Sequence, residues 1–347
     1  MPPDDEPPLH RAPSRVLIIL LGSIGDVVRA LPLLGRLRAA WPAAYLAWAV
    51  EPKSAPLLIG HPWLDQIITY DRRRAPWSFL PFLAQVRGGR FELVLDLQRH
   101  LKSGVISLSS GAPDRIGFAR ENVKEFNHKF STRTIAAQPA MRSKLLQYQA
   151  FGDAVGAPPA PITFGLAPSA ARSSRARELL ESAARPRVAV NLNSSWPSRM
   201  LFPETIAAAI RALGAPSEHG PAFTPVLIGS PDDRDLANQV MHAIPDLPIV
   251  NLAGVTGLDE LPAIFTECDA VFGPDCGPMH IAAAVGCPTV SLWGATAPAR
   301  SAPWGFADFA ISGEIPCSPC YLRQCPIGRE CMRRIDPALI TKAVRRA

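Results

Sequence analysis

The sequence predicts an α/β protein of two domains, each built on a parallel, doubly wound sheet. Two observations indicate this fold class. In both halves of the chain, short apolar strands alternate with helical or loop segments of α/β length. A stretch rich in proline, alanine and serine at residues 157–175 separates the halves, and 347 residues are enough for two domains with a core each. We therefore expect a first domain at 15–156, a connection at 157–175 and a second domain at 176–347.

The expected elements follow from the spacing of apolar residues. In the first half we expect strands at 15–21, 45–50, 67–70 and 91–97, with helices at 27–38 and 143–155. In the second half we expect strands at 187–192, 225–228, 270–272 and 289–293, with helices at 175–184, 203–213, 258–267 and 279–285. A basic amphipathic helix at 336–346 closes the chain.

Composition and charge narrow the class of protein. Residues 1–14 are acidic and rich in proline, which indicates a disordered tail and not a signal peptide. No apolar run approaches the length of about eighteen residues that a membrane span needs. We therefore expect a cytoplasmic protein, with peripheral membrane contact still allowed. The formal net charge of +6 favours anionic partners such as phosphorylated sugars or acidic lipids, and no zinc-finger spacing or aromatic-basic interleaving favours nucleic acid.

The loop after the first strand is the first candidate site. It holds Ser23 and Asp26, but it lacks both the G-x-G-x-x-G spacing of dinucleotide sites and the lysine of a P-loop. Asp26 also stands where a helix cap is expected, and that structural role would explain it as well as a functional one.

A second candidate site lies where the strand at 270–272 turns into a helix. Asp275, Cys276, Gly277, Pro278 and His280 follow one another there. Proline suits the first helical position, glycine lets the backbone approach a ligand, and the amides of a helix N-terminus attract phosphate. An ordinary crossover with a capped helix is the alternative interpretation.

A third strand-to-helix turn carries Ser194, Ser195 and Arg199. Two hydroxyl groups that donate hydrogen bonds and a cation that offsets charge suit a phosphate. A serine-rich cap with a surface arginine is the alternative.

Basic residues gather in the first half. Arg99, His100 and Lys102 follow the strand at 91–97, at the sheet edge where ligands bind in this architecture, and we interpret them as contacts to an acceptor. Arg72–Arg74 precede a segment with proline and tryptophan, and they are either solvated surface or a basic lip that attracts an anionic, membrane-embedded acceptor.

Three motifs together resemble the bacterial heptosyltransferases of glycosyltransferase family 9. The Ser-x-Gly-Asp segment at 23–26 is similar to the family's first loop, and 275–280 is similar to its Asp-Thr/Ser-Gly-x-x-His segment, with Cys276 in place of the hydroxyl residue. Residues 294–298 match Gly-x-Thr-x-Pro, and Arg199 stands where the family has a phosphate-binding lysine.

The resemblance implies a GT-B arrangement, in which two Rossmann-like domains face each other across a cleft. It implies an inverting glycosyltransferase that moves heptose from ADP-heptose onto a lipopolysaccharide core at the inner membrane face, with no metal required for the chemistry. Asp26 would be the catalytic base. The donor would be bound by Ser23, Ser194, Ser195, Arg199, Asp232, Thr256, Asp275, Cys276, Gly277, Pro278, His280 and Thr296.

The resemblance also extends to the acceptor side. Residues 114–118 resemble the family's Arg-Ile-Gly-Phe segment, so Arg115 and Arg120 join Arg99, His100 and Lys102 as candidate acceptor contacts. A short edge strand with an exposed arginine explains Arg115 equally well. Three rival functions stay open: transfer from another nucleotide sugar, a nicotinamide-dependent oxidoreductase, and a metal-binding protein without catalysis.

That last rival depends on Cys317, Cys320, Cys325 and Cys331, which are spaced as C-x2-C-x4-C-x5-C. Stable disulfides are rare in the cytoplasm, so such a cluster suggests a structural zinc. The spacing matches neither common ferredoxin pattern, which disfavours an iron–sulfur cluster. Four reduced cysteines in a compact loop are the alternative.

Overall fold

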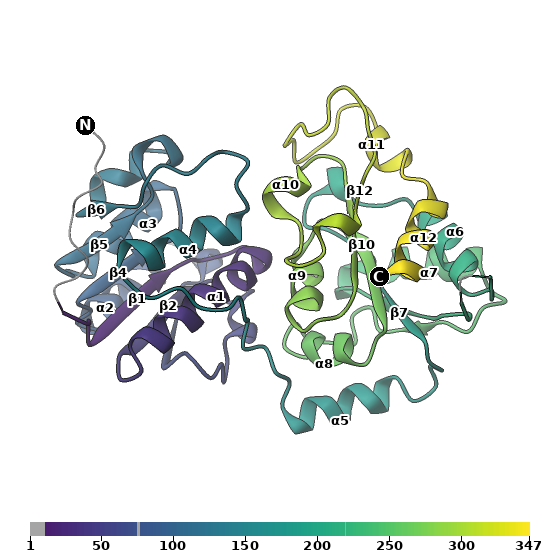
Figure 1. Ribbon diagram of the computed structural model, residues 1–347, viewed down its shortest axis with the longest axis horizontal. Coiled ribbons are helices and arrows are strands. Elements are labelled where there is room, and N and C mark those ends of the chain that lie inside the picture. Colours follow the sequence, from purple (N-terminus) through teal and green to yellow (C-terminus); the bar gives the residue numbers. More distant parts are fainter. Residues whose placement is uncertain (1–10, 75–76, 219) are drawn as a thin grey trace. The chain divides into compact units, whose positions relative to one another are not determined.

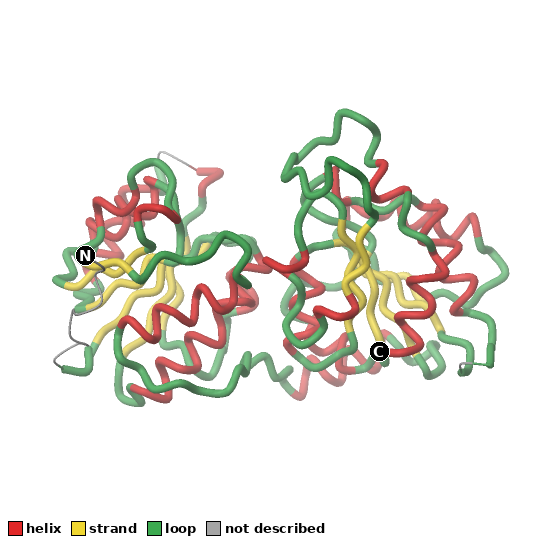
Figure 2. The backbone as a smooth tube through the Cα atoms, turned by 45° about the horizontal axis from the view of Figure 1, so that its top comes forward, coloured by secondary structure: helices red, strands yellow, loops and turns green. Residues whose placement is uncertain are grey.

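The computed structural model describes residues 11–74, 77–218 and 220–347, so most of the expected tail lies outside the described residues. The chain divides into two compact units, Met1–Gly165 and Leu166–Ala347, and the division falls within the segment 157–175. In each unit a sheet lies between layers of helices (Figure 1, Figure 2). No helix in the described part of the chain is both long enough and apolar enough to cross a membrane.

Unit 1 is built on a six-stranded parallel sheet with the order β3-β2-β1-β4-β5-β6. Its strands are β1 (Arg15–Ile19), β2 (Tyr45–Val50), β3 (Gln66–Thr69), β4 (Leu93–Asp96), β5 (Asp114–Gly117) and β6 (Arg133–Thr134). The chain winds outward from β1 in both directions, so the carboxyl ends of all six strands meet at one sheet edge.

Four helices cover the two faces of this sheet: α1 (Ile24–Ala40), α2 (Phe79–Gly88), α3 (Leu101–Ser109) and α4 (Lys144–Ala154). Helices α1 and α4 pack against each other, and α2 packs beside α3. Buried residues of α2 and α3, including Phe82, Val86 and Ile106, join the inward side chains of β1 and β4 in one core. The helices thereby fix the loops at the carboxyl edge, where the first candidate site lies.

Unit 2 repeats this plan with the order β12-β11-β10-β7-β8-β9. Its parallel strands are β7 (Arg187–Asn191), β8 (Thr224–Ile228), β9 (Val250–Asn251), β10 (Ala270–Pro274), β11 (Thr289–Trp293) and β12 (Ala310–Ser312). Its helices are α5 (Ala170–Leu179), α6 (Pro203–Leu213), α7 (Arg234–Ala243), α8 (Leu261–Thr266), α9 (Gly277–Ala284), α10 (Pro298–Ser301), α11 (Glu330–Arg333) and α12 (Pro337–Arg346).

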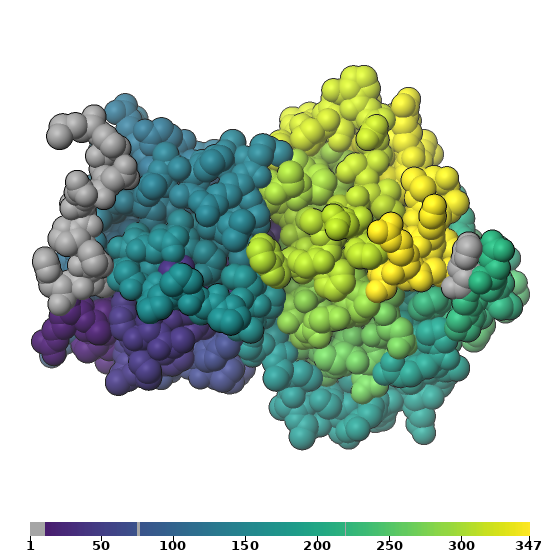
Figure 3. Space-filling view, viewed as in Figure 1, coloured from purple at the N-terminus to yellow at the C-terminus, as the bar shows by residue number. Residues whose placement is uncertain are grey.

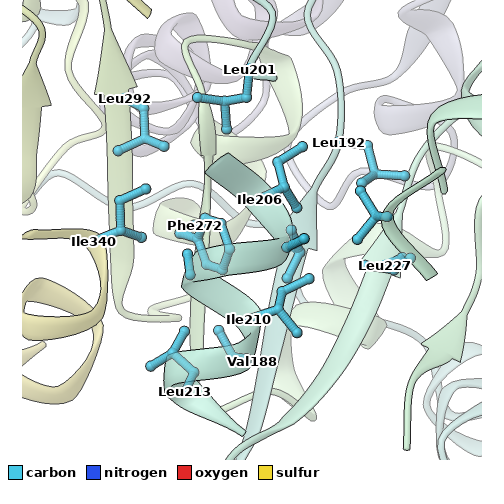
Figure 4. Packing of buried hydrophobic residues seen from close by; sticks show 14 of the residues in the cluster. Val188, Leu192, Leu201, Ile206, Ile210, Leu213, Leu227, Phe272, Leu292 and Ile340 are labelled. Carbon is cyan, nitrogen blue, oxygen red and sulfur yellow. The ribbon is translucent and has the colours of Figure 1, made fainter. Parts of the chain in front are cut away.

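The core of unit 2 lies between α6 and the sheet. Ile206, Ile210 and Leu213 on one face of α6 point at Phe272 and neighbouring strand residues, and Ile340 of α12 closes the side of the cluster (Figure 4). Apolar residues at helical spacing on α6 therefore account for this packing. The carboxy-terminal segment, yellow in Figure 3, is exposed on the outside of unit 2.

The predicted fold class is confirmed in each unit, and the strands fall within a few residues of their predicted bounds. The helix predicted at 175–184 is wrong by five residues at its start. Helix α5 begins at Ala170 because Ser169 caps it, with the Ser169 hydroxyl accepting a hydrogen bond from the Arg172 backbone at 3.4 Å.

Candidate active site

The first loop places Asp26 at the carboxyl edge of unit 1. Strand β1 ends at Ile19 and α1 begins at Ile24, so Asp26 lies in the first turn of the helix. The residue that caps α1 is Ser23, which corrects the structural interpretation of Asp26 as the cap. The Ser23 hydroxyl donates to Asp26 Oδ2 at 3.1 Å. Asp26 is therefore not the cap residue of α1, and its remaining partners lie on the other carboxylate oxygen.

Three donors converge on the second carboxylate oxygen of Asp26. Arg29 Nη2 lies 2.7 Å from Oδ1, Lys144 Nζ lies 2.8 Å away, and the Tyr148 hydroxyl lies 3.2 Å away. Only 15% of the Asp26 side chain is exposed. The cluster thus joins the start of α1 to two successive turns of α4.

The charges around Asp26 set its protonation. Burial would raise the pKa of the Asp26 carboxyl, but Lys144 and Arg29 outweigh burial and hold that pKa well below its usual range. Burial, together with the Asp26 charge, raises the pKa of Tyr148 well above its usual value. At neutral pH the site therefore holds an ionised carboxylate and a neutral phenol, an arrangement that can accept a proton but has reduced basicity.

A second buried carboxyl, Asp96, stands at the end of β4 on the same edge. It accepts hydrogen bonds from the Gln98 backbone at 3.0 Å and from Asn127 Nδ2 at 2.9 Å. Burial raises the pKa of Asp96 to about 7, although these hydrogen bonds oppose the rise. Asp96 differs from Asp26 in its hydrogen-bond donors, which are two amides and the Ser103 hydroxyl and include no cation.

The residues predicted to contact an acceptor do not form one cluster. Arg99 donates to the Gln147 side chain and lies 4.1 Å over the Phe118 ring. His100 is exposed and lies 3.6 Å from Glu125, and Lys102 Nζ lies 5.4 Å from the centroid of the Tyr70 ring. All three follow β4 at the carboxyl edge, as the sequence predicts.

Arg115 and Arg120 lie elsewhere on β5 and its loop. The Arg115 guanidinium donates to the backbone carbonyls of Phe130 at 2.9 Å and Ala112 at 2.6 Å, which ties neighbouring loops together. Strand β5 pairs with β4 and β6, so the alternative of an edge strand is wrong. Arg120 is exposed in the short helix that follows.

In unit 2, Asp275 joins the two predicted phosphate loops. Strand β10 ends at Pro274 and α9 begins at Gly277, which places Asp275 between them. Arg199 Nη1 and the Thr296 hydroxyl each donate to Asp275 Oδ2 at 2.6 Å. The Ser194 hydroxyl donates to the Asp275 carbonyl at 2.8 Å. Side chains from loops far apart in the sequence therefore meet at this residue.

Arg199 keeps one donor unused within this cluster. Its side chain is only 12% exposed and its guanidinium lies 4.4 Å over the Trp196 ring. Among the described residues, no hydrogen-bond partner faces its buried Nε. A buried guanidinium N–H without a partner is unusual and is suited to an anion such as a phosphate.

An amide network that the sequence did not indicate supports the same loops. Asn191 Nδ2 donates to the Asn193 carbonyl at 2.7 Å and lies 3.1 Å from Cys276 Sγ. Asn193 in turn donates to Asp233, whose other carboxylate oxygen accepts from the Ser230 backbone and hydroxyl at 2.7 Å each. Burial raises the pKa of the Cys276 thiol to about 12, so it is neutral.

The remaining donor candidates differ in exposure. Asp232 and Ser195 face solvent, whereas the neighbouring Asp233 is buried in the amide network. Gly277 and Pro278 form the first turn of α9, and His280 is buried in the same helix. The Thr256 hydroxyl is buried, and no partner for it occurs in the described part of the chain.

The cysteine loop packs against the donor loops of unit 2. Ser318 donates to the Gly294 carbonyl at 2.6 Å, and the Tyr321 backbone donates to the Ala295 carbonyl at 2.7 Å. A Cβ on Gly294 would lie 2.5 Å from Cys331 Sγ, so this glycine is needed for the close packing of that sulfur. The cysteines thus lie in a loop that braces the residues just before Thr296.

The four clustered cysteines form no disulfide bond with one another. Cys317, Cys320, Cys325 and Cys331 are free, and Cys317 is exposed while Cys331 is buried. In the ranges 11–74, 77–218 and 220–347, no three His, Cys, Asp or Glu side chains are grouped so that they could hold a metal ion. The side-chain positions therefore do not form the tetrahedral thiolate site that zinc requires, and the structural zinc stays a prediction.

Sequence reasoning missed the partners of Asp26 and the amide network of unit 2. Arg29 lies three residues after Asp26, a spacing at which side chains on a helix meet, and that signal was available. Lys144 and Tyr148 share a face of α4 by their spacing of four, but nothing local connects α4 to Asp26. Asn191 and Asn193 alternate at the end of a strand, which was the available signal for the amide network.

Comparisons with known proteins agree with this arrangement. A model of glycosyltransferase family 9 (heptosyltransferase) matches residues 80–330. Lipopolysaccharide core heptosyltransferase OpsX of Haemophilus influenzae is 27% identical, over 88% of this chain and 86% of its own length. Lipopolysaccharide heptosyltransferase 1 of Pseudomonas aeruginosa is 25% identical, over 90% of this chain and 87% of its own length.

Solved structures show the same fold. ADP-heptose lipopolysaccharide heptosyltransferase II of Escherichia coli gives a TM-score of 0.74 at 20% identity, covering 95% of this chain and 97% of its own. The E. coli heptosyltransferase WaaC, solved with ADP-2-deoxy-2-fluoro heptose, gives a TM-score of 0.69 at 18% identity, covering 94% and 98%. The fold is therefore the GT-B type that the resemblance to the heptosyltransferases implied.

Proposed function

Because this chain belongs to glycosyltransferase family 9, the heptosyltransferases, we propose that it transfers heptose from ADP-heptose to a lipopolysaccharide core. The enzyme is a glycosyltransferase, and the two relatives described above are both lipopolysaccharide heptosyltransferases. The observation that carries the assignment of the donor site is the cluster of Arg199, Asp275 and Thr296, with its unused buried N–H.

In the proposed reaction, an acceptor hydroxyl attacks the anomeric carbon of the donor sugar. The carbon–oxygen bond to the diphosphate breaks as the new glycosidic bond forms, and the configuration inverts. Asp26 accepts the hydroxyl proton, for which its ionised carboxylate is available at neutral pH. ADP leaves with both electrons of the broken bond.

The residues of unit 2 would stabilise this leaving group. Arg199 offers its Nε to a phosphate oxygen, and Asp275 holds the guanidinium in place through Nη1. The backbone amide of Gly277, in the first turn of α9, lies at the positive end of a helix, which favours the diphosphate. We also propose that Ser194 and Thr296 act by orienting Asp275, since both hydroxyls are bonded to it.

The acceptor and location follow from the same family membership. A lipid-linked core sugar would be an anionic glycolipid, which fits the formal net charge of +6. We propose that the protein works on the cytoplasmic face of the inner membrane, as a peripheral enzyme.

A transfer assay tests the proposal. Purified protein is supplied with ADP-heptose and a core acceptor that lacks the added heptose, and the product is detected by mass. A mass increase of one heptose with release of ADP is the expected result. Activity only with UDP- or GDP-sugars would contradict the choice of donor, and no transfer from any nucleotide sugar would contradict the assigned reaction.

A further inference from the structure

The surface at the start of α2 exposes large apolar side chains. Trp77 is 86% exposed and Leu80 is 73% exposed, which makes them the most exposed large hydrophobic side chains in the described part of the chain. Single exposed apolar residues are ordinary on a protein surface, but a tryptophan and a leucine three residues apart form a local apolar projection. Both belong to one turn of chain at the entry to α2.

Three arginines adjoin these apolar residues. Arg72, Arg73 and Arg74 form a short 3-10 helix just before them. Arg72 lies 3.7 Å from Glu51 and Arg74 lies 3.4 Å from Asp71, while 68% and 82% of the two arginine side chains stay exposed. Exposed pairs of this kind are weak and are screened by salt, so the guanidinium groups remain able to bind another anion.

We call Arg72, Arg73, Arg74, Trp77 and Leu80 the docking patch. It follows β3 directly, so it lies at the carboxyl edge of the unit 1 sheet. This is the edge that also carries Asp26 after β1.

Aromatic packing fixes the patch in place. The Tyr70 ring, at the end of β3, packs on Phe79 and Phe82 of α2, with centroids 5.5 and 5.1 Å apart. Lys102 lies over the same Tyr70 ring, which brings a candidate acceptor residue of α3 beside the patch. The docking patch is therefore held by side chains that pack into the core of unit 1, and it lies next to Lys102, a residue proposed to contact the acceptor.

We propose that the docking patch binds the surface of an anionic lipid bilayer. Tryptophan is favoured at the boundary between headgroups and acyl chains, and a basic cluster beside it is attracted to lipid phosphates. The positive charges of the three arginines in the patch complement the negative charge of such a bilayer surface. This inference rests on the proposed function, in which the bilayer carries the lipid-linked acceptor. Docking through the patch would turn the sheet edge that carries Asp26 toward that acceptor.

Vesicle flotation of the full-length protein, without any nucleotide sugar, tests the proposal. The vesicles are made of phosphatidylglycerol with phosphatidylethanolamine, or of phosphatidylcholine alone. We expect binding to the first kind, little binding to the second, and a loss of binding at high salt. No binding to the anionic vesicles, or equal binding to both kinds, would overturn the proposal.

Matched variants distinguish binding through the docking patch from nonspecific binding through other charged or apolar side chains. R72S/R74S is expected to lower partitioning by roughly 25-fold, at about fivefold for each arginine. W77S/L80S is expected to lower it about tenfold or more. The controls R175S/R211S and W304S remove exposed arginines and a partly exposed tryptophan of unit 2. Controls that lose binding as strongly as the patch variants would also overturn the proposal.

A soluble acceptor distinguishes failure of docking from failure of the proposed function. Heptose transfer to a deacylated core oligosaccharide does not need a bilayer, so W77S/L80S should keep the wild-type rate there and lose rate only on acceptor embedded in vesicles. Equal rates of W77S/L80S and wild type on both acceptors would contradict docking and leave the transferase assignment intact. Absence of transfer by the wild type, with flotation unchanged, would contradict the transferase assignment alone.

Discussion

Asp26 and Asp275 lie at the carboxyl edges of two sheets of the same winding plan, but they follow different strands and their surroundings differ. Asp26 follows β1, the first strand of its sheet, whereas Asp275 follows β10, the strand whose place in the sheet order corresponds to that of β4. In unit 1, two cations and a phenol converge on one oxygen of Asp26, and the other oxygen accepts only the Ser23 hydroxyl among the hydrogen bonds described. In unit 2, Asp275 is held by one arginine and two hydroxyls.

This difference shows how one sheet edge can serve two kinds of chemistry. The cations around Asp26 keep it ionised, which suits a proton acceptor. Asp275 instead orients Arg199, whose unused Nε suits a phosphate. We therefore propose that unit 1 carries the proton transfer and unit 2 the diphosphate binding, and the predictions below test that division.

The largest effect is expected from Asp26→Asn. Asparagine keeps the size of the side chain but cannot accept the proton, so kcat/KM for transfer should fall by about 10²- to 10⁴-fold. Steady-state release of ADP in the presence of acceptor measures this. Near-normal turnover in a variant whose thermal unfolding shows that it is folded would exclude Asp26 as the base.

A smaller effect is expected from Arg199→Met, which removes the charge and its hydrogen bonds from unit 2. A hydrogen bond to a charged group contributes about 1.5–3 kcal/mol, so ADP affinity should fall by about 10- to 100-fold. Titration calorimetry with ADP measures this. Arg211→Met, at an exposed arginine on α6, is the matched control, and equal losses in the two variants would contradict the phosphate role.

A change in pH dependence is expected from Lys144→Met. Lys144 lowers the pKa of Asp26, so removing it raises that pKa, and the acidic limb of the kcat/KM profile should move to higher pH. The measurement is kcat/KM across the acidic range for both proteins. Lys342→Met, at a lysine on α12 of unit 2, is the control, and a profile that stays in place in Lys144→Met would show that Lys144 does not set the basicity of Asp26.

The smallest effect is expected on the pH dependence of folding stability, to which the buried Asp96 carboxyl contributes. Its folded pKa of about 7 lies above the ordinary value of 3.8, so the folded state binds more protons than the unfolded state between those values. This contribution to stability is complete below about pH 4 and is lost as pH rises through about 7.

Asp96→Asn should remove the contribution of Asp96 to the pH dependence of the free energy of unfolding. The slope of that free energy against pH should change by at most about 1.4 kcal/mol per pH unit. Denaturant unfolding of both proteins at several pH values between about 5 and 8 measures this dependence. Asp26, whose pKa is lowered, contributes in the opposite sense, with stability lost as pH falls below the ordinary carboxyl range. Identical slopes in wild type and Asp96→Asn would refute the raised pKa.

The sequence was sufficient for the fold because its signals are local. Runs such as Arg15–Leu21 and Pro203–Leu213 carry their periodicity in a few residues, and alternation of such runs indicates a parallel sheet. The helix at α5 was misplaced because its capping serine lies in a segment whose composition indicates a linker.

The candidate site was predictable only in part. The strand-to-helix loops at 23–26, 194–199 and 275–280 are visible in the sequence, but the contacts that their side chains make within each unit are not. Lys144 meets Asp26 across 118 positions and Arg199 meets Asp275 across 76, separations over which only packing decides which side chains touch. The sequence did not indicate that Asp233 is buried and its neighbour Asp232 exposed, because burial cannot be read from two adjacent aspartates.

The most direct test of the division between the two units is the ADP affinity of Asp26→Asn, measured by calorimetry beside its transfer rate. The account predicts that the variant binds ADP as tightly as the wild type and loses transfer by at least about 100-fold. A variant that loses ADP affinity and transfer in the same proportion would contradict it, because Asp26 would then serve donor binding and not proton transfer.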